Sequence, residues 1–146
     1  MLNPALLAAV TAAAADGYDR ESEQPLPWPL AFIVAPMVLH RGTRDALPGA
    51  ISTHIHVWVS RQSSVRAGFP LRARVLVEPV KEGLRFGVRH GLLRVDAGGV
   101  RSGGQRLRFD DIGDIRTIVR RATFVGRWLS RAEHPSTVFA LLGVAP

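Results

Sequence analysis

The stretch GLLRVDAGGVRSGGQRLRF, residues 91–109, constrains the fold more than any other part of this 146-residue chain. Leu93 and Val95 alternate with polar residues, which is typical of a strand with one buried face. The pair Gly98-Gly99 supplies the positive φ angles that a tight hairpin turn needs. The sequence therefore predicts a β-hairpin, with residues 106–109 as a candidate third strand.

Three short helical segments are predicted before the hairpin. A helix over residues 51–59 repeats apolar side chains at i, i+4 spacing, a second begins at Ser63 or Ser64, and a third has Pro79 in its first turn and ends at Gly91. Helices followed by a glycine-turned hairpin are the outline of a winged helix-turn-helix. We therefore expect an α+β fold, a mainly helical winged helix-turn-helix-like domain with a small β-hairpin wing.

The N-terminal part predicts a helix and a buried apolar extension. Asn3 and Pro4 fit the N-cap and first position of a helix, which we expect to end at Gly17. Residues 19–29 hold three prolines spaced by two and predict an extended connector. Residues 30–39 are almost wholly apolar and predict either a strand or a helix kinked by its internal proline.

Two further helix starts are visible in the sequence. Thr43 fits the cap of a short helical turn that Pro48 ends. After the hairpin, Asp110 or Asp111 fits the cap of a long helix whose apolar positions follow a helical period. A short apolar segment, TVFALL, lies near the C-terminus.

The length fits one domain with its own core. Apolar residues make up 47% and charged residues 21% of the chain, which is ordinary for a globular protein. We expect a single winged-helix-like adaptor domain over residues 1–146. Its parts are the N-terminal helix and extension (1–48), the helix-turn-helix plus wing (49–109) and the C-terminal helices (110–146).

Cysteine is absent, which removes disulfides, thiolate nucleophiles and cysteine-based zinc sites. The apolar run over residues 5–15 has no basic region before it and is too short to span a bilayer. We expect a cytoplasmic protein without a membrane anchor.

No catalytic, metal or cofactor residue is predicted. His54 and His56 diverge on a helix and have no third ligand nearby in the sequence. The aspartates before the last helix are better explained as caps than as a magnesium site. The glycine-rich GGVRSGG lacks the spacing of a phosphate-binding loop. We therefore expect that the protein is not an enzyme.

The positive charge is concentrated in the second part of the chain. Residues 61–146 carry fifteen arginines and Lys81 against seven acids, a net charge of +9, whereas residues 1–60 carry a net charge of −2. Such a field favours a polyanionic partner. Residues 79–90 hold no Asn, Gln or Ser for reading bases, so we expect contact with the DNA backbone only. The predicted DNA-binding residues are Arg72, Arg74, Arg85, Arg89, Arg94, Arg101, Arg106 and Arg108.

Two alternatives to DNA binding stay open for these arginines. An acidic protein would use the same side chains as DNA does. Arginine could also fill ordinary solvated surfaces, in which case the positions mark no binding site.

The motif FVGRW lies within the last long helix. A glycine inside a helix costs about 1 kcal/mol relative to alanine, which indicates that something packs closely against Gly126. We expect partner binding at Phe124, Gly126, Arg127 and Trp128, with the domain's own core as the alternative.

Four segments together resemble a known family: NPALLAAV, LPWPLAFIVAPMVLHRGTRDALP, FVGRW and TVFALLGVAP, in this order. They resemble the middle component of bacterial three-component ABC systems. The resemblance implies a non-catalytic adaptor between an SMC-like ABC ATPase and a third, variable component in systems that act against phage or other invading DNA. It also implies a basic residue where this chain has Ala145. The two-fold symmetry common in assemblies is compatible with a homodimer.

Two rival functions remain. A free-standing winged-helix transcription regulator would need a sequence-reading helix, which residues 79–90 do not offer. A nuclease or toxin would need a convergent set of carboxylates, histidines or thiols, and none is predicted.

Overall fold

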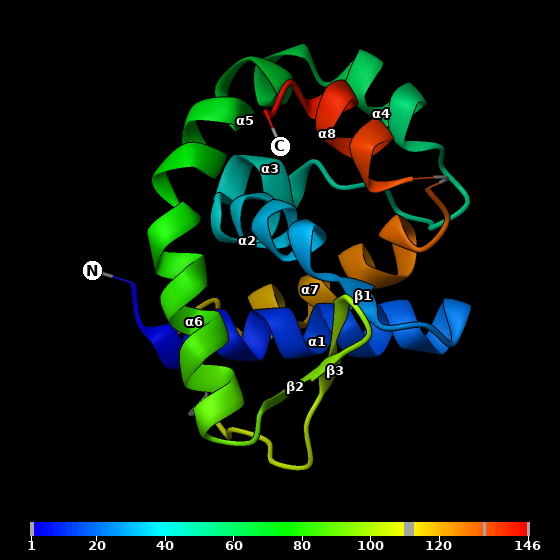
Figure 1. Cartoon of the computed structure of the whole chain (residues 1–146). Coiled ribbons are helices and arrows are strands. Elements are labelled where there is room, and N and C mark those ends of the chain that lie inside the picture. The colour runs from blue at the N-terminus through cyan, green and yellow to red at the C-terminus, as the bar shows by residue number, and fades with distance from the viewer. Residues whose placement is uncertain (1, 110–112, 133, 146) are drawn as a thin grey trace.

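The computed structural model describes residues 2–109, 113–132 and 134–145. Helices dominate, and a small antiparallel sheet lies at one edge of the molecule (Figure 1). The helices are α1 (Pro4–Ser22), η1 (Trp28–Leu30, a 3-10 turn), α2 (Ala31–Leu39), α3 (Arg41–Asp45), α4 (Ile55–Arg61), α5 (Ser63–Val75), α6 (Val77–Arg89), α7 (Ile115–Leu129) and α8 (Pro135–Leu142); the strands are β1 (Leu26–Pro27), β2 (Leu93–Asp96) and β3 (Gly99–Ser102). The predicted mainly helical α+β class is confirmed.

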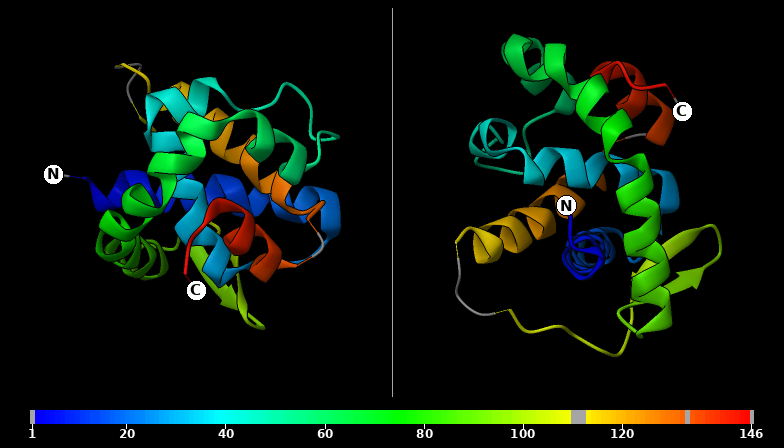
Figure 2. Two further views of the ribbon diagram at one scale, coloured as in Figure 1. Left: turned by 90° about the horizontal axis from the view of Figure 1, so that it is seen from above. Right: turned by 90° about the vertical axis from the view of Figure 1, so that its left-hand side faces the viewer.

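Helix α1 is the element around which the others pack. Figure 2 (right) looks along it and shows α7 on one side and α6 on the other. Asn3 caps it as predicted, because its side chain accepts the Ala5 N–H at 2.8 Å. The predicted end at Gly17 is wrong. The helix continues to Ser22 and ends where Glu23 takes a positive φ of 57°.

Gly17 has a packing role inside α1 that explains why the helix does not stop there. A Cβ at this position would collide with the backbone oxygen of Thr123 on α7. The glycine therefore lets two helix backbones approach closely, and this tertiary contact outweighs its weak helix propensity.

The predicted hairpin is confirmed, but its turn lies one residue earlier than expected. Ala97 and Gly98 carry the positive φ angles, 34° and 81°. Gly99 begins β3 instead, where Pro25 and the Leu26 carbonyl leave no room for a side chain.

The third strand is not the predicted one. Residues 105–109 form no strand; β1 (Leu26–Pro27) pairs with β3 in the order β1-β3-β2, with Leu26 opposite Val100. The proline connector thus supplies a strand edge and the 3-10 turn η1. Two residues in a strand carry no alternation that a sequence pattern could show.

The apolar segment 30–39 is a helix with Pro36 inside it, the second of the two predicted forms. The short helix α3 follows it at once. Its cap is His40 rather than the predicted Thr43: the His40 Nδ1 accepts the Thr43 backbone N–H at 3.1 Å.

Helices α5 and α6 bear on the winged-helix prediction. The predicted starts near Ser63 and Pro79 are close to the observed ones, whereas the preceding helix α4 begins only at Ile55. Only Leu76, in the right-handed helical conformation, separates α5 from α6. A helix-turn-helix has a turn of about three or four residues there, so this detail of the winged-helix prediction is not confirmed.

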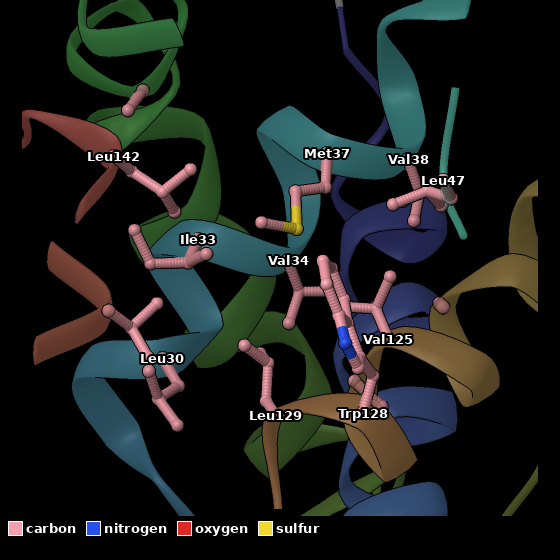
Figure 3. Packing of buried hydrophobic residues seen from close by; sticks show 14 of the residues in the cluster. Leu30, Ile33, Val34, Met37, Val38, Leu47, Val125, Trp128, Leu129 and Leu142 are labelled. Carbon is pink, nitrogen blue, oxygen red and sulfur yellow. The ribbon is translucent and has the colours of Figure 1, made fainter. Parts of the chain in front are cut away.

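The main core takes side chains from α1, α2, α4, α5, α7 and α8, and Figure 3 shows the part of it around α2. Ile33, Val34 and Met37 from α2 are fully buried against Val125 and Leu129 from α7. The predicted caps Asp110 and Asp111 of the last helix lie outside the described residues. No described helix is long and apolar enough to cross a membrane.

Candidate nucleic-acid and partner interface

Helix α6 presents a charged face because its opposite face is fixed on α1. Val80, Gly83 and Gly87 are buried, and the two glycines allow close contact with Leu7 and Ala8 of α1. The side chains at the other face are exposed, and they include the predicted Arg85 and Arg89. Opposed buried and charged faces are typical of an amphipathic helix with a solvent-facing or binding surface.

The two predicted arginines of α6 differ in their partners. Arg85 forms an ion pair with Glu82 one turn earlier, at 2.5 Å. Arg89, in the last turn, has no ion-pair partner within the described part of the chain. Arg89 is therefore the more available cation for an external phosphate or carboxylate.

Of the two hairpin arginines, one is held in ion pairs and the other is not. Arg94 and Arg101 are cross-strand neighbours in the β2–β3 register. Arg101 is bound to Asp96 at 2.7 Å and to Asp19 of α1 at 2.5 Å, and the hydrogen bonds to these carboxylates raise its pKa. Arg101 thus fastens the hairpin to α1, whereas Arg94 is exposed and pairs with no described residue.

Residues 102–109 carry two more of the predicted arginines. Arg106 is largely exposed and lies 3.2 Å from an oxygen of Asp16 on α1. Arg108 is exposed and makes no ion pair with a described residue. Arg89, Arg94 and Arg108 are thus exposed cations without an ion-pair partner among the described residues.

The two predicted arginines of α5 point to different places. The Arg72 guanidinium donates to the Thr43 hydroxyl at 3.2 Å and to the Val65 carbonyl at 3.3 Å, and its Nε is buried without a partner. Arg74 is exposed and free of ion pairs in the described structure. Arg72 therefore joins α5 to α3, and only Arg74 faces solvent.

The predicted partner-binding set lies on α7, where the structure divides it between core and surface. Trp128 is 3% exposed; its N–H donates to the Thr53 carbonyl at 2.7 Å, and its ring packs edge-on against Trp58. Gly126 is buried against Ala14 of α1, so the predicted close approach is confirmed, within this chain.

Phe124 and Arg127 are half-buried and nearer the surface. Arg121 lies over the Phe124 ring, 4.5 Å from its centroid, and burial lowers the pKa of that guanidinium. Arg127 is bound to Glu21 of α1 at 2.7 Å. Partner binding through this set stays a prediction.

Several histidines and acids of the described residues cap helices or form ion pairs. His134 caps α8 by accepting the Ser136 N–H, and the buried Arg44 pairs with Asp114 at 3.3 Å. The prediction that His54 and His56 diverge is wrong: His54 precedes α4, and the two ring centroids lie 5.5 Å apart. The described residues hold no group of three or more side chains suited to a metal ion.

One surface groove is lined by residues that are not among the predicted site residues. Four of these residues are Trp28 and Phe32, from the segment LPWPLAF, and Phe139 and Val144, from the segment TVFALLGVAP. The only local signal was a tryptophan flanked by prolines, outside any periodic apolar face. Pairing segments so distant in sequence requires the tertiary structure.

Comparison with known proteins places the whole chain in one family. The sequence model described as "ABC-three component (ABC-3C) system Middle Component 3" matches residues 1–146. No curated protein and no solved structure matches the chain.

Proposed function

Because the chain belongs to the family of middle component 3 of ABC-three component systems, matched over its full length, we propose that it is a non-catalytic adaptor. It joins an SMC-like ABC ATPase to the third component of the same system, in the cytoplasm, in defence against phage or other invading DNA. The full-length family match is the observation that carries this proposal.

The use of polar side chains supports binding rather than chemistry. His40 and His134 cap helices, and Asp16, Asp19 and Asp96 hold hairpin arginines. These side chains have a role in holding helix ends and the hairpin together, which needs no chemistry to explain it.

Contact with the DNA backbone is the second part of the proposal. Arg89, Arg94 and Arg108 are exposed and unpaired in the described structure; Arg94 lies on β2, and the other two lie in the segments before and after the hairpin. The exposed residues of α6 include no Asn, Gln or Ser. Contacts of this kind would position DNA without reading its sequence, which favours an adaptor over a transcription regulator.

Co-purification with the proteins encoded beside its gene tests the adaptor function. The expected result is a ternary complex in which the ATPase and the third component associate only when this protein is present. An ABC ATPase from an unrelated system serves as the control and should not associate. The proposal fails if the protein binds neither neighbour, or if the neighbours associate equally well without it.

A further inference from the structure

An apolar groove of about 470 Å³ lies where η1, α2, the α5–α6 joint and the C-terminal segment meet. Trp28 and Phe32 line one side, Val77 begins α6 at the joint, and Phe139 and Val144 line the C-terminal side. Helix α8 lies beside α5, and a Cβ at Gly143, directly after α8, would lie 3.4 Å from Pro70 of α5. The volume is in the range of sites that hold small ligands or a few side chains.

Trp28 differs from the other two tryptophans in every respect that bears on binding. Its exposure is 54%, against 4% for Trp58 and 3% for Trp128. The N–H groups of Trp58 and Trp128 donate to the carbonyls of Ala46 and Thr53, whereas no described residue accepts the Trp28 indole N–H. Phe32 holds the Trp28 ring edge-on, with centroids 6.3 Å apart.

A large aromatic side chain that is exposed, held in place and left with a free donor is the kind of residue that dominates protein interfaces. Burying the remaining surface of Trp28 would gain hydrophobic free energy without ordering a flexible side chain.

The charged residues that line the groove are both cations. Arg74 has no ion-pair partner within the described structure. Lys81 is paired with Glu78 at 3.3 Å, and Glu78 itself does not line the groove. An occupant with carboxylates beside its apolar part would complement this rim.

We propose that this groove docks a segment of a second protein that presents a few large apolar side chains flanked by Asp or Glu. Apolar walls with two cations suit such a segment better than duplex DNA, whose phosphates would leave the aromatic walls unused. The groove as a docking site is argued independently of the proposed adaptor function. We also expect that a neighbouring gene encodes the docked protein, and this expectation alone rests on the adaptor function.

Selection from a phage-displayed library of random peptides tests the groove directly. Wild-type protein should enrich peptides that combine aromatic or aliphatic residues with acids. Trp28→Ser and Val77→Asp should each weaken binding of those peptides by about thirtyfold. The double charge reversal Arg74→Glu with Lys81→Glu should weaken the binding of acidic peptides. It should not weaken the binding of the same peptides with Gln in place of each acid.

A matched control is Val88→Ser, because Val88 is an exposed apolar residue of α6 that does not line the groove. This variant should bind like the wild type, and every variant should first show a cooperative thermal transition. The proposal is overturned if no peptide is enriched, or if enriched peptides bind folded Trp28→Ser as well as the wild type. A wild-type dimer in light scattering that Trp28→Ser dissociates would also overturn it, because a second copy would then fill the groove.

The adaptor complex separates this proposal from the proposed function. If the ternary complex forms and folded Trp28→Ser supports it fully, the groove proposal fails for the system's own partners while the adaptor function stands. If no complex forms but the peptides bind in a Trp28-dependent manner, the adaptor function fails and the groove stands.

Discussion

Gly126 of α7 faces the carbonyl group of Ala14 on α1 so closely that a side chain at position 126 would collide with that backbone. Gly17 makes the reciprocal contact with the Thr123 carbonyl of α7. The two helices therefore cross through a pair of glycines, one contributed by each. This crossing holds the N-terminal and C-terminal parts of the chain together.

Gly126→Ala should lower the free energy of unfolding by about 2 kcal/mol or more, because the added methyl forces two helix backbones apart. The gain in helix propensity, about 1 kcal/mol, has the opposite sign and is smaller. Chemical denaturation monitored by circular dichroism measures the difference. Gly126→Leu should prevent cooperative folding.

Gly104→Ala is the control for this substitution, because nothing lies within 4 Å of a Cβ at that position. Its stability should be unchanged or slightly raised, since alanine restricts the unfolded chain more than glycine does. A Gly126→Ala protein as stable as Gly104→Ala would contradict the proposed crossing. A folded Gly126→Leu variant that loses the ATPase would instead place this glycine in the interface.

The glycines show which features of the fold could be predicted from the sequence. A glycine in mid-helix predicted a close approach at Gly126, but could not name Ala14 as the neighbour. The same residue type at Gly17 was interpreted as a helix end, because local propensity does not contain the packing of α7. The hairpin was predictable since turn residues and alternation are local; β1 was not, because its partner lies more than seventy residues away.

The predicted site residues were also only partly correct, because their ion pairs and exposure depend on tertiary contacts. Arginine counts located the basic half of the chain. They could not separate Arg101, which is bound to two carboxylates, from Arg89, which pairs with no described residue. The sequence placed Trp128 among the predicted partner contacts but did not place Trp28 among them. Exposure decides between them, and exposure is a property of the fold.

Trp128→Phe should lower the free energy of unfolding by about 1–3 kcal/mol. It removes the hydrogen bond to the Thr53 carbonyl and part of the packing against Trp58. The matched substitution Trp28→Phe should change stability by less than about 0.5 kcal/mol, since Trp28 is exposed and donates no hydrogen bond to a described residue. Thermal unfolding of both variants tests the pair, and equal losses would contradict the assignment of Trp128 to the core.

Arg89→Gln and Arg94→Gln should each weaken binding to duplex DNA of any sequence. The affinity of the wild type should fall steeply with salt, and each variant should reduce the slope of log affinity against log salt by about 1. Fluorescence anisotropy with two unrelated duplexes measures this. Wild-type binding that salt does not weaken, or that strongly prefers one duplex, would rule out backbone contact.

Arg101→Gln provides the contrast among the arginines. Its guanidinium already bridges Asp96 and Asp19, so the substitution should leave the salt slope almost unchanged and lower the thermal stability instead. If Arg101→Gln changes the slope as much as Arg89→Gln does, Arg101 contacts DNA despite its ion pairs.

The stability of the protein should fall as the pH drops below 6.5, in part through His40. The pKa of His40 lies below its usual 6.5 because burial and the nearby Arg72 and Arg44 disfavour the imidazolium. The unfolded chain therefore takes up a proton at this position at a higher pH than the folded chain does. The contribution of His40 is complete above pH 6.5, starts to fall there, and is lost once the pH passes through the lowered pKa.

The geometry of the cap gives the physical reason and the test. His40 Nδ1 must be unprotonated to accept the Thr43 N–H that it caps, so a proton on that nitrogen removes the cap. His40→Asn should keep a capping acceptor without titrating, and His40→Ala should lose the cap at every pH, at a cost of about 1 kcal/mol. The denaturation midpoints of wild type and His40→Asn should be measured from above pH 6.5 downward. Both proteins contain the other four histidines, so the difference between their midpoints reports on His40 alone. That difference should be small above pH 6.5 and should grow in favour of His40→Asn as the pH falls; a difference that stays constant would show that the His40 cap does not titrate with folding.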